Sequence, residues 1–215
     1  LLAYAGLKYI FLGMQSGSEK IRMQIYKRSE TNEDLLRAAR IIRKYAPNTE
    51  LRFDTIMSEF ETPETLREGI VFMLNFPKPF GTNKNQMAYY LDFDVTETAL
   101  QQGLITQYDI ASVNREKRSQ VANQEDVEKN PFINYYYLVG KKIVPNWFIR
   151  FCLNNRIETK YPKAFSKSYI FFDTIETKTQ QFKRLIYLIK NGEFRYVARK
   201  IFGINRDKEE IIKVV

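Results

Sequence analysis

Three apolar segments with the character of β-strands recur about 40 residues apart, and each is followed by a helical pattern. They are residues 8–14 (KYIFLGM), 51–57 (LRFDTIM) and 86–95 (QMAYYLDFDV). Strands that alternate with helices at this spacing predict βα units and a parallel sheet, so the predicted fold class is α/β. Because βα crossovers are right-handed, we expect the carboxyl ends of the strands at one edge, where α/β folds bind ligands.

Helix-start signals stand where this alternation needs them. Ser16 and Glu19 have the spacing of a capping box. Thr31, and Thr62 directly before a proline, are good N-caps for two longer helices. A short helix over residues 96–102 is predicted to end at a glycine.

The predicted strand ends carry polar residues and are the first candidates for a site. They are expected to converge: residues 14–16, 57–59 and 93–95. Gln15 is the strongest candidate, because a polar amide at the end of a buried strand must find hydrogen-bond partners; capping the next helix is the alternative role. Asp54 lies inside the second strand, and alternation places Arg52 on the same face, so an ion pair between them is expected.

The residue types that are absent exclude several kinds of chemistry. The chain has no histidine, and Cys152 is its only cysteine. This excludes Ser-His and Cys-His catalysis, histidine-ligated zinc or haem, an internal disulfide and a cysteine-built metal cluster. The longest dense apolar stretch, residues 70–76, is far shorter than the roughly 20 residues that cross a bilayer, and no secretory signal is visible. We therefore expect a soluble, cytoplasmic protein.

The charge is unevenly distributed along the chain. Residues 1–140 hold 17 Lys and Arg against 18 Asp and Glu, a net charge of −1, whereas residues 141–215 hold 17 against 7, a net charge of +10. A polar stretch with few large apolar residues precedes the change. The predicted organisation is an α/β part over residues 1–107, a polar linker over residues 108–132, and a basic, aromatic-rich, mainly helical region over residues 133–215.

Aromatic and basic residues are interleaved in this last region. Phosphates attract cations and bases stack on rings, so one interpretation is a non-catalytic module that binds RNA or another polyanion through residues 141–215. An anionic membrane surface suits basic amphipathic helices as well. The interpretation favoured by the helical spacing is a helical cap whose aromatics are buried, with Trp147, Phe151 and Leu153 packing inward.

Four short motifs, in order and at sensible spacing over residues 3–107, are similar to those of one enzyme family. Residues 6–19 (GLKYIFLGMQSGSE) resemble the "AG…G(I/V)(E/Q)SGSE" signature of radical SAM enzymes, closest to the cobalamin-binding and methylthiotransferase-like branches. Residues 25–28 (IYKR) with Thr31, residues 54–58 (DTIMS) with Glu61 and Thr62, and residues 98–100 with 103–105 resemble its later motifs. Ser58 and Phe60 depart from that pattern, because the family has glycine and proline there.

The resemblance implies the C-terminal half of a partial (βα)6, TIM-like barrel. It implies S-adenosylmethionine bound on a four-iron, four-sulfur cluster, and in some branches cobalamin, with the cofactor supplying the radical chemistry. The family's Cys-x3-Cys-x2-Cys loop is not in this chain, so the cluster ligands are expected on a preceding N-terminal part of the same protein. The substrate would be a small molecule or an RNA. The residues implied to contact the cofactor are Gln15, Ser16, Ser18, Lys27, Arg28, Met57 and Ser58.

Each of these roles has an alternative in which the residue serves only the structure. Ser16 and Ser18 have ordinary helix capping as their alternative, and Lys27 and Arg28 a solvated pair of charges at a helix end. For the chain as a whole, a structural or assembly role is the third hypothesis. It predicts neither cofactor nor polyanion binding, but association with a partner that covers the open edge of the sheet.

Overall fold

A computed structural model describes residues 6–110 and 130–190 of the chain. The described residues up to Tyr169 belong to one compact unit and those from Ile170 to a second. The domain boundaries predicted from the sequence stay a prediction. No helix in the described residues is long and apolar enough to cross a membrane.

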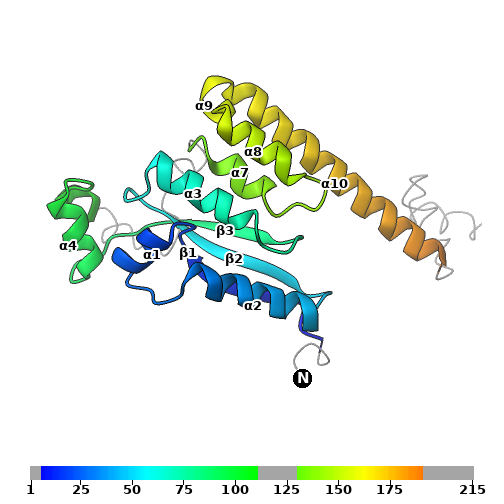
Figure 1. Cartoon of the computed structure of the whole chain (residues 1–215), viewed down its shortest axis with the longest axis horizontal. Coiled ribbons are helices and arrows are strands. Elements are labelled where there is room, and N and C mark those ends of the chain that lie inside the picture. Colours follow the sequence, from blue (N-terminus) through cyan, green and yellow to red (C-terminus); the bar gives the residue numbers. More distant parts are fainter. Residues whose placement is uncertain (1–5, 111–129, 191–215) are drawn as a thin grey trace, which may run out of the picture. The chain divides into compact units, whose positions relative to one another are not determined.

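The first unit is an α/β structure built on a parallel sheet of three strands, as predicted from the sequence (Figure 1). The strands lie side by side in chain order: β1 (Tyr9–Gln15), β2 (Glu50–Met57) and β3 (Gly81–Gln86). Both strand pairs are parallel, so all three carboxyl ends point the same way. This sheet positions the ends of β1 and β2 beside each other.

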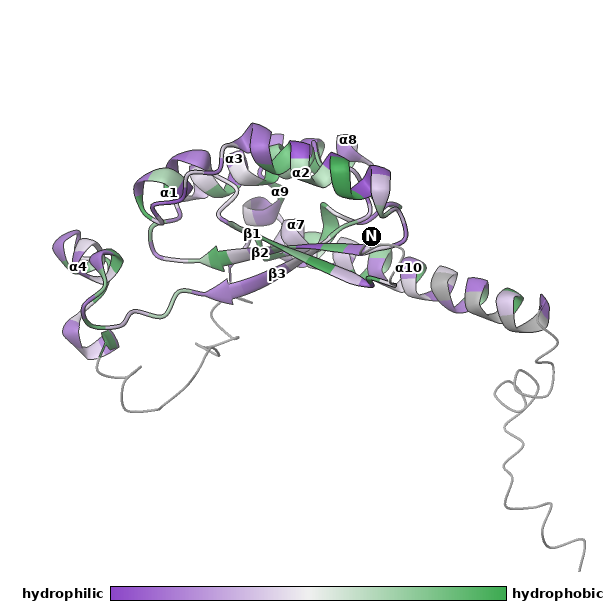
Figure 2. Ribbon diagram, turned by 90° about the horizontal axis from the view of Figure 1, so that it is seen from below, coloured by the Kyte–Doolittle hydropathy of each residue, from purple (hydrophilic) through white to green (hydrophobic). Residues whose placement is uncertain are grey.

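The connections between the strands are helical. They contain α1 (Glu19–Gln24), α2 (Asn32–Tyr45) and α3 (Pro63–Met73). Thr31 and Asp34 form a capping box at the start of α2, and Thr62 and Thr65 form one at the start of α3, so both predicted N-caps are confirmed. Figure 2 shows these three helices on the same side of the sheet.

The core lies between this helical layer and the sheet. Alternate residues of β2 face it, among them Phe53, whose ring stacks on Phe76 at 4.2 Å between centroids and meets Phe80 edge-on. The other face of the sheet is not covered by described residues of this unit. It carries exposed Tyr9 and Phe11 of β1, each about half accessible to solvent.

The third strand lies earlier in the chain than predicted. Residues 81–86 (GTNKNQ) pair with β2, whereas the predicted segment 86–95 contains only the last residue of β3 and then runs into α4 (Asp94–Gln101). The sequence of β3 has no large apolar residue, so hydrophobic patterning could not reveal it. Its backbone pairing and the hydrogen bond from Thr55 Oγ1 to the Asn83 carbonyl, 2.8 Å, hold it in place.

One local prediction, an ion pair within β2, is wrong. Arg52 pairs with Glu50 at 2.6 Å, and Asp54 accepts a hydrogen bond from Asn83 at 2.7 Å, so the expected pair between Arg52 and Asp54 does not form. Asn83 lies beside Asp54 on the neighbouring strand and offers the closer partner.

The helical region after residue 133 is confirmed over its described residues. It comprises α7 (Ile133–Leu138), α8 (Asn146–Asn154), α9 (Ile157–Lys160) and α10 (Pro162–Lys190). α7 packs against β3, where Thr82 Oγ1 donates to the Tyr136 carbonyl at 2.8 Å. Trp147 and Phe151 are 69% and 55% exposed, so the prediction that they pack inward is wrong, while Leu153 is buried as predicted. Residues 191–215 of this predicted region lie outside the described residues.

Candidate functional site

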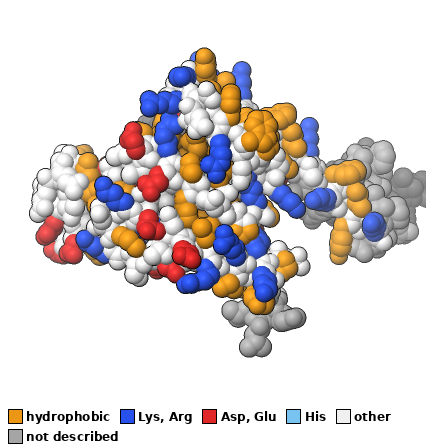
Figure 3. All heavy atoms as spheres, viewed as in Figure 1, with side chains coloured by type: hydrophobic (Ala, Val, Ile, Leu, Met, Phe, Trp, Pro, Cys, Tyr) orange, Lys and Arg blue, Asp and Glu red, His pale blue; other side chains and the backbone are white. Residues whose placement is uncertain are grey.

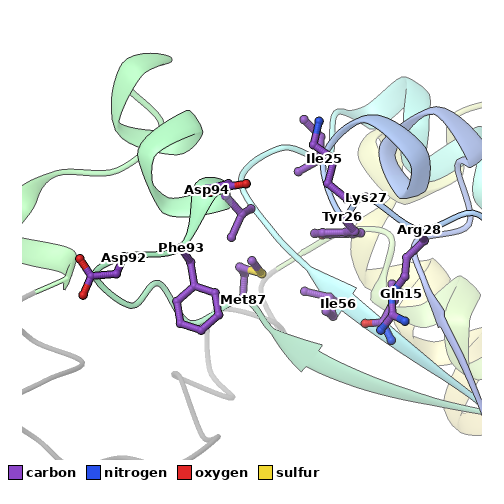
Figure 4. Close-up of a pocket in the computed structure, with 11 residues that line it drawn as sticks. Gln15, Ile25, Tyr26, Lys27, Arg28, Ile56, Met87, Asp92, Phe93 and Asp94 are labelled. Atoms are coloured by element: carbon purple, nitrogen blue, oxygen red, sulfur yellow. The ribbon is translucent and has the colours of Figure 1, made fainter.

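A pocket of about 410 Å³ opens at the carboxyl ends of β1 and β2 (Figure 4). Its walls come from the end of β1, the turn after α1, the end of β2 and the segment that leads into α4. The lining residues are Gln15, Ile25, Tyr26, Lys27, Arg28, Ile56, Met87, Asp92, Phe93, Asp94 and Val95. The volume falls within the roughly 300–1,000 Å³ of small-molecule sites, and the position is the one α/β folds use for ligands.

Gln15 ends β1 in a strained turn. The N–H of Ser16 donates to the carbonyl of Met14 at 2.8 Å, which closes a three-residue γ-turn around Gln15. The φ angle of Gln15 is 63°, and γ-turns with a positive φ are the rare and strained kind. The register of β1 against β2 also shifts here, so the turn acts as a bulge that changes the direction of the Gln15 side chain.

Left-handed backbone is concentrated around this pocket. Four described non-glycine residues have a positive φ, and three of them line it: Gln15 at 63°, Lys27 at 53° and Asp92 at 70°. The fourth, Arg156, lies in the turn before α9. Each such residue costs of order 1 kcal/mol, and residues held in this region cluster at ligand and catalytic sites. Hence the sequence retains side chains at positions where glycine would be less strained.

The two sides of the pocket differ in charge. Lys27 and Arg28 both line the pocket, but Figure 4 shows their side chains pointing apart: Arg28 lies beside Gln15, whereas the Lys27 amine points away from both. Asp94 stands on the opposite wall, whereas the carboxylate of Asp92 points away from the cavity. Apolar side chains fill the space between, with Met87 and Phe93 facing Ile56 across the pocket. This arrangement suits an elongated ligand with a negative group at one end and a positive group at the other.

Tyr26 connects the pocket to Ser58. Its hydroxyl donates to Ser58 Oγ at 2.8 Å, and burial, as the largest effect, raises the pKa of Tyr26 above its ordinary value. Tyr26 therefore stays protonated at neutral pH. Ser58 lies one contact behind the pocket wall, and Met57 is buried in the core beside it.

The serines after β1 have internal partners. Ser16 and Ser18 are buried, the N–H of Ser18 donates to Ser16 Oγ at 3.0 Å, and Ser18 Oγ donates to Glu68 Oε2 at 3.0 Å. Buried Arg22 donates to the Ser16 carbonyl at 2.7 Å. The predicted capping box is wrong, because Ser18 is the N-cap of α1. These contacts assign both serines to packing of the loop.

The seven predicted contact residues thus divide into two groups. Gln15, Lys27 and Arg28 come together in the pocket, whereas Ser16, Ser18, Met57 and Ser58 do not line it. Sequence reasoning placed residues 93–95 at this edge of the sheet, and they line the pocket, but it did not single out Tyr26, Ile56 or Met87. Met87 falls in a predicted strand that in fact ends one residue before it, and the signal that could have found Tyr26 was its place directly before the two cations.

The described residues offer no metal centre. No group of three or more His, Cys, Asp or Glu side chains is placed to hold a metal ion within residues 6–110 and 130–190. Cys152 is buried in α8, and burial raises the pKa of its thiol to about 11, so it is protonated at neutral pH.

Lys84 on β3 is a titratable residue that the sequence did not single out. Its Nζ lies 3.2 Å from the centre of the Tyr137 ring on α7. Burial, and then the charges of Arg52 and Lys141, lower the pKa of Lys84 to about 7. The ring partly offsets this shift, because it attracts the cation.

The lowered pKa predicts a pH-dependent effect of replacing Lys84. Its ordinary pKa is 10.5, so the charged amine destabilises the fold below about pH 7, and this cost fades as the pH rises towards 10.5. We expect Lys84→Met to stabilise the chain by about 1–2 kcal/mol at pH 6 and by much less at pH 10. Urea unfolding at both pH values measures the difference. Equal gains at both would mean that packing, rather than charge, causes them.

Comparisons of the sequence with protein-family models, with curated proteins and with solved structures found no match. A functional assignment for this chain therefore rests on its motifs and on the residues of the pocket.

Proposed function

We propose that this chain is the C-terminal part of a radical SAM iron–sulfur enzyme, and that the pocket at the ends of β1 and β2 contacts S-adenosylmethionine. The observation that carries the proposal is the set of strained residues around the pocket, because Gln15 and Lys27 belong to motifs that resemble this family and both have left-handed backbone at the cavity.

The fold supports the barrel part of the proposal. Three parallel strands in chain order, with helices on one face, are what the second half of a (βα)6 barrel would contain. β1 pairs with β2 on one side, and no described strand lies on its other side. A preceding part of the same protein would continue the barrel at this edge and carry the cluster ligands, and in some branches a cobalamin domain.

The donor set fits the ligand. S-adenosylmethionine carries a carboxylate, an ammonium, a sulfonium and an adenosine, whose ribose is polar and whose base has an aromatic face. Arg28 would hold the carboxylate, because its guanidinium lies beside Gln15 and offers a two-pronged geometry, and Lys27 would add a second positive charge to the pocket lining. Asp94 would face a positive group, Gln15 would hydrogen-bond the ribose, and Met87 and Phe93 would pack on the adenosine. The cofactor, when bound on its cluster, would supply the radical chemistry.

Binding can be tested without the cluster. We expect titration calorimetry with S-adenosylmethionine and S-adenosylhomocysteine to detect binding to the whole chain, and Arg28→Leu to weaken it at least tenfold, since a charge-assisted hydrogen bond is worth about 1.5–3 kcal/mol. The matched control is Arg40→Leu, an exposed arginine on α2 away from the pocket lining. Absence of binding up to about 1 mM, or equal losses in both variants, would contradict the assignment of the pocket.

A further inference from the structure

The outer face of α8 exposes two aromatic rings one helical turn apart. Trp147 and Phe151 are 69% and 55% exposed, and Arg150 and Asn154 lie exposed on the same side of the helix by their spacing. The opposite side of α8 is buried, through Ile149, Cys152 and Leu153. The two rings therefore face solvent, because the opposite side of the helix packs in the core.

Contacts at both ends hold α8 in this orientation. Asn146 Nδ2 donates to the Leu74 carbonyl at 2.9 Å, and Arg67 Nη1 donates to the Leu153 carbonyl at 2.6 Å. Both partners come from α3 or the residue directly after it. A helix fixed at both ends presents its rings without needing to reorganise, which lowers the entropic cost of binding.

The surroundings of these rings are positively charged. Residues 141–169 contain seven Lys and Arg and one acidic residue, Glu158. Glu158 is only 1% exposed and is paired with Arg67 and Tyr135, so this segment presents no carboxylate to solvent. Figure 3 shows the same distribution of charge on the face that it presents. The acidic side chains lie over α1, α2, α4 and the start of α3, whereas hydrophobic and basic side chains occupy the surface over α7 and α8.

We propose that the outer face of α8 binds single-stranded nucleic acid, with bases stacking on Trp147 and Phe151 and phosphates meeting Arg150 and the neighbouring cations. Exposed rings interleaved with cations are the general design of such surfaces. A lipid surface would require a continuous apolar face, but a guanidinium and an amide share this stripe with the rings. The inference narrows the polyanion interpretation of residues 141–215 to one helix, and it does not depend on the pocket.

Trp147 is the only tryptophan of the chain and reports directly on this surface. We expect a twelve-nucleotide oligouridylate, added to the whole chain, to quench the Trp147 emission through stacking and to show an affinity that falls steeply with salt. Polyphosphate of similar charge has no bases and should bind without that quenching. Quenching by both polymers alike would overturn the stacking part of the proposal.

Variants locate the site on α8. Phe151→Ala should weaken oligouridylate binding at least about fivefold, and Arg150→Gln should weaken it and reduce the salt dependence. The matched control is Tyr45→Ala, which removes another exposed ring, 68% accessible and close to Lys44, from α2. That variant should keep the affinity of the parent chain.

The remaining outcomes are decisive as well. Anionic vesicles of phosphatidylserine and phosphatidylcholine test the alternative ligand. If they shift the Trp147 emission to the blue while the oligonucleotide causes no response, the α8 surface binds a membrane and the nucleic-acid proposal is overturned. No response to either, or equal losses in Phe151→Ala and Tyr45→Ala, would overturn the proposal. Because Arg28→Leu should leave oligouridylate binding unchanged, failure here is distinguishable from failure of the proposed pocket.

Discussion

Replacing Glu158 by alanine is expected to lower the free energy of unfolding by about 3–5 kcal/mol, because it leaves buried polar groups without their partner. Glu158 on α9 is almost fully buried. Its carboxylate accepts from the Arg67 guanidinium of α3 and, at 2.8 Å, from the Tyr135 hydroxyl of α7. Removing the carboxylate leaves one charge and one hydroxyl in the interior.

The loss should also be cooperative across the first unit. Arg67 lies on Phe132, 5.2 Å from the ring centre, and its Nη1 holds the end of α8. One guanidinium therefore joins α3 to Phe132, to the end of α8 and to α9. Urea unfolding followed by circular dichroism measures the change, and Glu158→Gln, which retains hydrogen-bonding capacity, should lose less than Glu158→Ala.

An exposed ion pair provides the control for this prediction. Glu50 and Arg52 lie 2.6 Å apart on β2, with side chains 44% and 40% exposed. Glu50→Ala should cost less than about 1 kcal/mol, since solvent screens such pairs. If both alanine variants lost the same stability, the Glu158 pair would not be the link between α3 and the helical region.

Local signals were enough to predict most of the α/β unit. Thr31 and Thr62 predicted the starts of α2 and α3, because their side chains cap backbone N–H groups. This interaction involves only residues within four positions of each other. The position of β3 was not predicted, because an edge strand held by backbone pairing needs no apolar residue. Its pairing with β2 also depends on residues about 30 positions away. The sequence therefore predicted the order of the elements better than the position of the third strand.

The residues of the pocket and of the α8 surface were only partly predictable, because they also depend on contacts between residues far apart in the sequence. Motifs near the ends of β1 and α1 were enough to predict Gln15, Lys27 and Arg28 as site residues. The left-handed backbone of Gln15 and Lys27, however, is a consequence of the tertiary structure and could not be predicted from those motifs. On α8, periodicity identified a stripe containing Trp147 and Phe151 but could not say which side of the helix meets the core. The link between Arg67 and Glu158 spans 91 positions and has no local signature.

Gly17→Ala is expected to destabilise the chain by about 2–3 kcal/mol or more, because the loop after β1 touches the backbone of α3. A Cβ on Gly17 would stand 2.4 Å from the Cα of Gly69 and 3.0 Å from its carbonyl oxygen. Neither is the flexible end of a side chain, so the loop would have to move away from α3. The same loop carries the γ-turn of Gln15, and the substitution should therefore also weaken ligand binding in the pocket.

Gly103→Ala separates this steric effect from the general cost of losing a glycine. Gly103 has a φ of 66°, and a Cβ at this position would have nothing within 4 Å, so its replacement should cost about 1 kcal/mol through backbone strain alone. It should leave pocket binding intact. If Gly17 instead served mainly to expose N–H groups to a bound anion, alanine there would reduce ligand affinity with little loss of stability. Because the N–H of Ser18 already donates to Ser16 and the loop is packed on α3, we expect the two losses to occur together.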